Sequence, residues 1–372
     1  MFSLYIHIPF CVRKCLYCDF LSGSYGEPVR EAYVQALTAE MERESVFYKN
    51  RNVETIFFGG GTPSLLTKEQ LTRLMETIYR EFHVSEDAEI SLEMNPGTAE
   101  QEKLNRLREL GINRLSIGLQ SDDDALLRRL GRIYSLEQFK RSYEMARKAG
   151  FANINIDIMS ALPGQRLLDY EKTLRTVTGY APEHISAYSL IVEEGTPFAE
   201  AFAQNRLDLP EEEEEREMYY RTKELLHEAG YERYEISNYA KSGFACRHNL
   251  AYWRRTDYAG FGIGAASLIN GVRYSNVREL KQYLTQTHIK RQIEPLDKKD
   301  AMEEFLFLGL RCIEGIRVSE FAKQFGIPVE RVYGQQIKRL REQGLLEEEE
   351  DRLRLTEHGI DVSNYVFEQF II

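Results

Sequence analysis

Three cysteines stand close together near the start of the chain, at Cys11, Cys15 and Cys18. Thiolates are the ligands of iron–sulfur clusters, and this spacing on one short loop lets them bind three irons of a cubane cluster. The fourth iron then keeps an open position for an exchangeable ligand. A zinc site ordinarily needs a fourth protein ligand, and no further Cys or His follows until His83. The spacing therefore predicts a 4Fe-4S cluster in preference to zinc.

A glycine run, Gly59-Gly60-Gly61, forms a second candidate segment and is followed by Thr62 and Pro63. Glycine has no side chain, so this backbone can approach a ligand closely and offer its amides and carbonyls. The run also fits an ordinary tight turn between a strand and a helix. Its place after a predicted strand, downstream of the cysteines, favours a ligand-binding role.

The segments around these motifs repeat a short strand, a turn and an amphipathic helix. Capping boxes of the form Ser/Thr-x-x-Gln mark helix starts at Thr67, Thr98 and Ser135. Strands separated by helices favour a parallel sheet. Strands are predicted at residues 4–9, 53–58, 89–95, 114–120, 153–160 and 184–190.

Apolar and polar side chains alternate within these strands. Leu92 and Ile117 lie on the apolar parity, whereas Glu93, Gln120 and Asp157 lie on the polar one. A parallel sheet covered by helices on both faces would be apolar throughout, so the polar face is expected to line a lumen. We therefore predict an α/β fold, an incomplete (βα)6 TIM-type barrel of parallel strands with its site at their carboxyl ends.

The rest of the chain divides into two parts. The repeat stops near residue 200, which assigns residues 1–200 to the partial barrel and residues 201–295 to a mixed connecting segment. Residues 296–372 show two helices at a turn and then a strand pair, the pattern of a winged-helix-like domain. This domain carries more acids than bases, including the acidic run at residues 347–351, so we expect no nucleic-acid binding.

Composition narrows the classes of function further. The 372 residues include 48 Lys and Arg against 59 Asp and Glu, a net charge of −11 that again disfavours nucleic acid as a partner. Clustered cysteines and the lack of a signal-peptide pattern favour the cytoplasm. The apolar tail at residues 365–367 and 370–372 is compatible with peripheral membrane contact, although packing is favoured, and a homodimer stays open.

These motifs together resemble the radical S-adenosylmethionine (SAM) superfamily, whose Cys-x3-Cys-x2-Cys signature binds a 4Fe-4S cluster with SAM on the fourth iron. The resemblance implies that the reduced cluster passes an electron to SAM and forms a deoxyadenosyl radical, with flavodoxin or ferredoxin as the type of electron donor. Two lumen carboxylates can hold the SAM ammonium and ribose hydroxyls. Carried over by position, the SAM contacts are Tyr5, Tyr17, Gly60, Gly61, Thr62, Glu93, Gln120, Arg132 and Asp157.

Longer matches place the resemblance in one branch. The segments at residues 5–11, 92–96, 118–121 and 162–165 are similar to those of oxygen-independent coproporphyrinogen III oxidases and of the related heme chaperone HemW family. The oxidases carry a further cysteine where this chain has Phe20, and the chaperones carry His-Asn-x-x-Tyr-Trp, which is complete here at residues 248–253. Both features favour the chaperone family.

The resemblance implies a protein that binds heme, a 4Fe-4S cluster and SAM, and that transfers heme to an acceptor protein. His248 offers an imidazole for the heme iron, Asn249 a hydrogen bond for a propionate, and Tyr252 with Trp253 a flat apolar surface. Cys246 is an alternative axial ligand, and a purely structural cluster is the alternative role of the motif. Radical decarboxylation of coproporphyrinogen III is the alternative function, and no catalytic residue is assigned.

The glycine segment at residues 260–264 and the C-terminal domain each allow a further interpretation. The segment Gly260-x-Gly262-x-Gly264 lacks the glycine spacing of a dinucleotide fingerprint, so we expect a tight loop, compatible with a place beside the SAM or heme pocket. A regulatory role of the C-terminal domain through DNA is disfavoured by its acidity.

Overall fold

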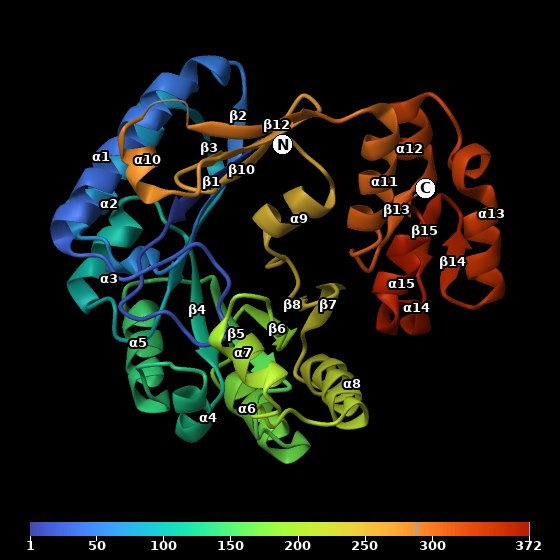
Figure 1. The fold of residues 1–372 in the computed structure, drawn as a ribbon, viewed down its shortest axis with the longest axis horizontal. Coiled ribbons are helices and arrows are strands. Elements are labelled where there is room, and N and C mark those ends of the chain that lie inside the picture. The colour runs from blue at the N-terminus through green and yellow to red at the C-terminus, as the bar shows by residue number, and fades with distance from the viewer. Residues whose placement is uncertain (287–288, 372) are drawn as a thin grey trace.

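The computed structural model describes residues 1–286 and 289–371, and its first half alternates strands with helices (Figure 1). Each predicted strand is present, and each pairs in parallel with the next along the chain. This confirms the parallel α/β architecture. The strands are β1 (Ser3–Ile8), β2 (Asn52–Gly60), β3 (His83–Met94), β4 (Arg114–Gln120), β5 (Ile154–Ser160) and β6 (His184–Ser189).

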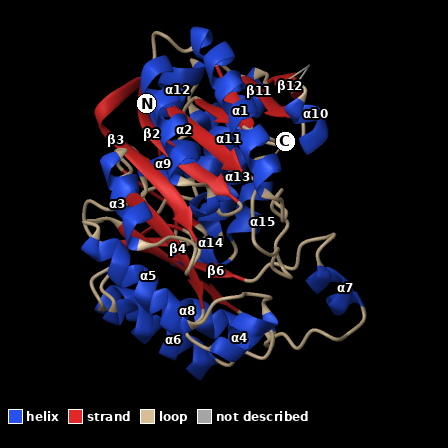
Figure 2. Cartoon of the chain, turned by 90° about the vertical axis from the view of Figure 1, so that its left-hand side faces the viewer, coloured by secondary structure: helices blue, strands red, loops and turns tan. Residues whose placement is uncertain are grey.

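Helices connect these strands and cover the outer face of the sheet (Figure 2). The capping boxes at Thr67 and Ser135 are confirmed. The one at Thr98 is wrong, because the Thr98 hydroxyl donates to the Asn95 carbonyl at 2.6 Å and closes a turn instead of capping a helix. The helices are α1 (Glu27–Glu44), α2 (Lys68–Glu81), α3 (Gln101–Glu109), α4 (Asp124–Arg129), α5 (Leu136–Lys148) and α6 (Leu167–Gly179), with short 3-10 turns at Ser45–Phe47 and Pro63–Leu65.

The segment after residue 200 extends the same sheet at both edges. Strand β9 pairs in parallel with β1, while β10 to β12 continue beyond it in antiparallel order, and β8 pairs with β6. Among the described residues, the strand order is β12-β11-β10-β9-β1-β2-β3-β4-β5-β6-β8-β7, and its two ends do not pair with each other, so the barrel is incomplete, as predicted. These elements are α7 (Pro197–Ala203), α8 (Glu212–Glu228), β7 (Glu232–Glu235), β8 (Asn238–Ala240), α9 (Arg247–Trp253), β9 (Tyr258–Phe261), β10 (Ala266–Ile269), β11 (Val272–Asn276), α10 (Leu280–Leu284) and β12 (Lys290–Pro295).

The C-terminal part forms a separate body on the far side of α9 (Figure 1). Its three-stranded antiparallel sheet β13-β15-β14 and its helices surround their own core, which contains the buried side chains of Phe321, Tyr333 and Val366. Packing of the tail is confirmed for Val366 and Phe370, while Ile372 lies outside the described residues. The elements are α11 (Lys298–Gly309), β13 (Ile316–Arg317), α12 (Val318–Phe325), α13 (Val329–Glu342), β14 (Leu346–Glu349), β15 (Arg352–Leu355), α14 (Glu357–Asp361) and α15 (Ser363–Glu368).

The alternation within the strands sorts side chains between two environments. Leu92, Ile117 and Ile156 are fully buried under the outer helices, where their burial stabilises the fold by about 1.5–3 kcal/mol each. The polar parity points into the lumen, so its charged groups are also shielded from bulk water. Among the helices that the structure describes, none is long and apolar enough to cross a membrane.

Candidate functional site

The three clustered cysteines lie on the loop that follows β1, and backbone hydrogen bonds close this loop. The Cys11 amide donates to the Gly23 carbonyl at 2.9 Å, and the Gly23 amide donates to the Pro9 carbonyl at 2.9 Å. Cys11, Cys15 and Cys18 are free, partly buried, and line one cavity of about 330 Å³. Burial raises the pKa of the Cys15 and Cys18 thiols. The structure thus brings the three predicted ligands to one cavity.

This donor set fits a cubane cluster better than a single ion. Within residues 1–286 and 289–371, no three His, Cys, Asp or Glu side chains are close enough to hold one metal ion. A cubane cluster takes each thiolate on a different iron, so its ligands stand apart around a larger body. Cys246 and Cys312 are buried elsewhere and do not line this cavity.

The cavity walls come from the carboxyl ends of the strands. Glu93 on β3, Gln120 on β4 and Asp157 on β5 all line it, as their parity predicts. Gln120 has a φ of 72°, a left-handed backbone that a non-glycine residue adopts at a cost of about 1–3 kcal/mol and that often marks a functional site. The remaining lining residues are Arg13, Lys14, Tyr17, Phe20, Gly60, Gly61, Met94, Asn95, Ser116, Gly118, Arg132, Met159 and Tyr188.

Two carboxyl groups in this cavity form no direct ion pair with a described Lys or Arg, although Arg114 acts on both through space. Glu93 accepts from the Gly60 amide at 3.0 Å, and burial, helped by the charge of Asp157, raises its pKa to about 8. Asp157 accepts from Ser116 at 3.1 Å and from Asn155 at 2.7 Å, and burial raises its pKa as well. Neither forms an ion pair with a Lys or Arg that the structure describes. Buried acids without a directly bonded cation fit a ligand that carries an ammonium group and hydroxyls, as SAM does.

A chain of hydrogen bonds connects the opposite wall to the first cysteine. Arg132 donates to Asn95 Oδ1 at 3.0 Å, Asn95 donates to the Thr62 hydroxyl at 2.8 Å, and Thr62 donates to Cys11 Sγ at 3.7 Å. Arg132 also donates to the Tyr17 hydroxyl. Thr62 is buried and does not line the cavity. It supports the cysteine loop from behind.

The glycine run is required by packing as well as by access to the cavity. A Cβ at Gly60, where φ is +105°, would lie 2.3 Å from the His7 ring. A Cβ at Gly61 would lie 2.7 Å from the Ile8 and Phe10 carbonyls. These glycines therefore let β2 pass close against β1, while their backbone lines the cavity.

Tyr5 lies in an adjoining chamber of about 430 Å³ that shares Gly60 and Glu93 with the cysteine cavity. Its hydroxyl is 3.1 Å from His7 Nδ1. The glycine loop at residues 260–264 borders this chamber through Gly264. The nine predicted SAM residues are therefore divided over two connected chambers and their supporting wall.

The motif at residues 248–253 forms α9, which lies across the amino-terminal end of the barrel strands. Glu89, the residue before Ile90 on β3, accepts from the Arg247 and His248 amides at 3.0 and 3.1 Å and holds the start of α9. Cys246 contacts the same carboxylate at 3.5 Å and is fully buried, away from any of the cavities described above.

His248 is 2% exposed, and burial lowers its pKa to about 3, so the imidazole is neutral. The Thr55 hydroxyl donates to Ser3, so Nδ1 of His248 donates to Thr55 at 2.8 Å. Nε2 then carries the lone pair and lies 3.3 Å from the Tyr252 hydroxyl. The ring also stacks on Phe57 with centroids 5.1 Å apart. This tautomer presents Nε2 as the nitrogen able to bind a metal.

The structure separates the four predicted heme residues. His248, Asn249 and Tyr252 line an inner chamber of about 200 Å³. Trp253 instead faces the C-terminal body, where it lines a cavity of about 290 Å³ and the Arg311 guanidinium lies 4.4 Å from its ring.

Several lumen residues were missed by sequence reasoning. Ser116 shares the polar parity of β4 with Gln120, and this signal was sufficient to include it, whereas Tyr188 lies on β6, where no site residue was predicted. Arg114, which lines the inner chamber, also shares that parity of β4, whereas Arg278, which lines the Tyr5 chamber, lies between β11 and α10 and gave no such signal. A charged residue such as Arg114 at a strand start is ordinarily exposed, so only the packing reveals that it is buried.

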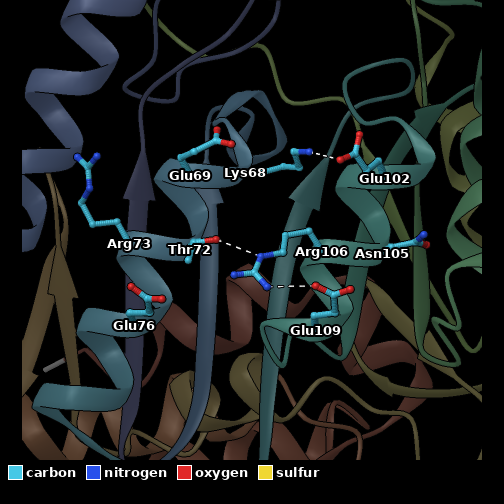
Figure 3. A pocket seen from close by; sticks show the side chains of 9 residues that line it. All are labelled: Lys68, Glu69, Thr72, Arg73, Glu76, Glu102, Asn105, Arg106 and Glu109. Atoms are coloured by element: carbon cyan, nitrogen blue, oxygen red, sulfur yellow. Dashed lines mark hydrogen bonds and ion pairs between the residues drawn. The ribbon is translucent and has the colours of Figure 1, made fainter.

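A larger groove, of about 660 Å³, lies on the outer surface between α2 and α3 (Figure 3). Its charges satisfy one another, since Lys68 pairs with Glu102, and Arg106 pairs with Glu109 at 3.1 Å. It contains none of the predicted site residues. We interpret it as a solvated groove between two helices.

Sequence comparisons agree with this geometry. The model of the Radical SAM superfamily matches residues 5–177, which span the cysteine loop and the first five strands. The model of the HemN C-terminal domain matches residues 296–362.

Similar proteins match over nearly the whole chain. The chain is 40% identical to "Heme chaperone HemW" of Bacillus subtilis, covering 100% of this chain and 99% of the relative, and 36% identical to that of Escherichia coli, covering 99% and 98%. Coproporphyrinogen III oxidase (HemN) from Escherichia coli, a solved structure, superposes with a TM-score of 0.87 at 27% identity over 99% of this chain and 89% of the oxidase. This chain belongs to the heme chaperone HemW family within the radical SAM superfamily.

Proposed function

We propose that this protein is a heme chaperone that binds heme, a 4Fe-4S cluster and SAM, and that passes heme to an acceptor protein. The observation that carries the proposal is the full-length similarity to relatives named heme chaperones. The complete His-Asn-x-x-Tyr-Trp segment on α9 and Phe20 in place of a further cysteine support it.

We assign the cluster to Cys11, Cys15 and Cys18. We assign SAM to the cysteine cavity and the adjoining Tyr5 chamber, with Glu93 and Asp157 as the acceptors for its ammonium and hydroxyls. When bound, such a cluster supplies single electrons to SAM. A flavodoxin or ferredoxin is the type of partner that would reduce the cluster again. The role of the protein is to fix the ligands and to exclude bulk water from them.

We assign the heme iron to Nε2 of His248, because this atom carries the lone pair of a neutral imidazole; heme binding would replace its contact with the Tyr252 hydroxyl. The inner chamber of about 200 Å³ does not hold a whole porphyrin, so binding requires α9 to turn this nitrogen outward. Trp253 already faces away from the inner chamber, in the cavity toward the C-terminal body, and offers a flat apolar surface, with Arg254 beside it for a propionate.

The test is anaerobic heme titration of the cluster-loaded protein, followed by absorbance. Saturable binding at one site is expected, and His248→Ala is expected to change the spectrum of bound heme, with recovery on addition of imidazole. A rate of heme delivery to an apo-globin that rises with the globin concentration would demonstrate direct transfer, since release into solvent is independent of the acceptor. Absence of heme binding would refute the proposal.

The alternative is oxygen-independent coproporphyrinogen III oxidase activity, which the close superposition on HemN favours. Anaerobic incubation with coproporphyrinogen III, SAM and a reductant separates the two functions. Catalytic formation of protoporphyrinogen would replace the chaperone proposal, whereas heme binding without turnover would retain it.

A further inference from the structure

Arg114 opens β4 at the amino-terminal end of the barrel and is only 2% exposed. Its guanidinium has no hydrogen bond and no ion pair with any residue that the structure describes, and its Nε is completely shielded from solvent. A guanidinium carries five donors and stays charged. Leaving such a group buried and unpaired costs several kcal/mol, so this side chain points to a missing anionic partner.

The partner has a place to bind. Arg114 lines the inner chamber of about 200 Å³, which has the volume of roughly six water molecules and accommodates a small organic acid. The chamber and the cysteine cavity are adjacent and share the lining residues Glu93, Ser116, Asp157 and Tyr188. A ligand can therefore reach the chamber through the cysteine cavity. Its floor is α9, which contributes His248, Asn249 and Tyr252.

The carboxylates of Glu89 and Asp157 favour the charged form of Arg114 through space, but among the described residues neither forms a hydrogen bond or an ion pair with it. Asp157 accepts from Ser116 and Asn155, and Glu89 accepts from the start of α9. Glu93, with a pKa of about 8, is protonated near neutral pH and can itself donate a hydrogen bond. The neutral His248 adds no positive charge. Arg114 therefore lines the chamber with a buried Nε–H that has no acceptor, although acidic groups lie near it.

We infer that this inner chamber is a carboxylate-binding site, in which Arg114 holds the two oxygens of a carboxylate side by side. The amide of Asn249 and the hydroxyl of Tyr252 lie in the same chamber and supply further donors. Bidentate pairing of arginine with a carboxylate is favoured over pairing with a spherical anion such as chloride. The carboxylate belongs either to a small free acid or to the end of a larger ligand that fills the cysteine cavity.

The test uses acetate as the probe and the full-length, cluster-loaded protein at constant ionic strength. Acetate is expected to raise the midpoint of thermal unfolding more than chloride does, because a ligand that binds only the folded state stabilises it. Arg114→Gln is expected to weaken acetate binding, measured by calorimetry, by about tenfold or more. Arg114→Lys keeps the charge but loses the planar fork, and is expected to show an intermediate affinity.

A second variant keeps the test decisive if Arg114 variants do not fold. Asn249→Asp places a negative charge in the same chamber and is expected to weaken acetate binding, whereas Lys68→Gln in the outer groove leaves it unchanged. Two results together would overturn the inference. Acetate and chloride would have equal effects on the native protein, and the SAM affinity of Arg114→Gln and of Asn249→Asp would be unchanged. The chamber would then hold water alone.

The two sources of the carboxylate are distinguished by repeating the titration with SAM present. Acetate binding that persists with SAM bound identifies a site for a small free acid. Acetate binding that SAM abolishes, with weaker SAM binding in Arg114→Gln, identifies the carboxylate end of a larger ligand. Both results support the site and neither depends on heme, so failure of the heme proposal leaves this one intact.

Discussion

The hydroxyl of Thr62 lies 3.7 Å from Sγ of Cys11, so the glycine-rich segment after β2 touches the first thiol of the cysteine loop. The same hydroxyl accepts a hydrogen bond from Asn95, which in turn accepts one from Arg132. Elements from β1, β2, β3 and the loop after α4 therefore meet behind one candidate cluster ligand. Hydrogen bonds to cluster sulfurs are among the factors that set a reduction potential.

Replacing Thr62 by Val should leave cluster assembly intact but lower the reduction potential of the cluster. The substitution removes a donor to Cys11 while keeping the shape of the side chain, and electron-rich thiolates stabilise the oxidised cluster. The measurement is a redox titration followed by electron paramagnetic resonance. Thr62→Ser restores the hydroxyl and should return the potential to that of the native protein, and an unchanged potential in Thr62→Val would contradict the role given to this contact.

Serine at Cys11, Cys15 or Cys18 should each abolish the cluster. Each thiolate is expected to bind a different iron, and no other cysteine lines the cavity among the residues that the structure describes. Iron and sulfide content after anaerobic reconstitution provides the measurement. Cys312→Ser is the matched control, because this cysteine is buried in another part of the chain, and it should retain the full cluster. Cluster loss in the control would refute the assignment.

Glu93→Gln should stabilise the ligand-free protein near neutral pH and at the same time weaken SAM binding. The pKa of Glu93 is raised from 4.5 to about 8 in the fold, so the folded protein holds a proton that the unfolded chain has lost across this range. Native stability therefore falls as pH rises from about 4.5 to 8, by about 1.4 kcal/mol per pH unit. Glutamine stays neutral, and the variant should be more stable by about 2–3 kcal/mol at pH 7.

Thermal or denaturant unfolding of the two proteins at pH 5 and at pH 7.5 tests this sign. The difference in free energy of unfolding should be small at pH 5 and large at pH 7.5. Glu102→Gln, on the exposed outer groove, is the control and should show no such pH dependence. SAM affinity of Glu93→Gln should fall by about tenfold or more, because a charge-assisted hydrogen bond is lost. Equal stability of Glu93→Gln and native protein at both pH values would contradict the prediction.

His248→Ala should destabilise the protein as well as alter heme binding. The imidazole stacks on Phe57 and donates to Thr55 in a buried position, so its removal leaves a cavity and takes away the donor to the Thr55 oxygen. Losses of about 2–4 kcal/mol are usual for such truncations. Denaturant unfolding measures the loss, and heme spectra must be compared at matched folded fractions. A variant as stable as the native protein would show that α9 does not depend on this ring.

Much of the fold was readable from the sequence, for a local reason. Strand and helix periods, and the capping boxes at Thr67 and Ser135, depend on neighbouring residues, so the six parallel strands and the polar lumen were predicted correctly. Thr98 shows the limit, because its hydroxyl closes a turn with Asn95 and the helix starts later. Strand β9 was not foreseen, since its pairing with β1 joins residues more than two hundred positions apart.

The sequence by itself determined the three cysteines as cluster ligands, their place after the first strand, and which side of the strands lines the lumen. Spacing and parity depend only on residues close together in one segment of the chain. Only the tertiary structure decided which way each side chain of α9 faces, with His248 toward the barrel and Trp253 toward the C-terminal body. It also decided that the Nε of Arg114 is buried without a hydrogen-bond acceptor. Burial and charge compensation arise where distant segments meet, and no local pattern encodes them.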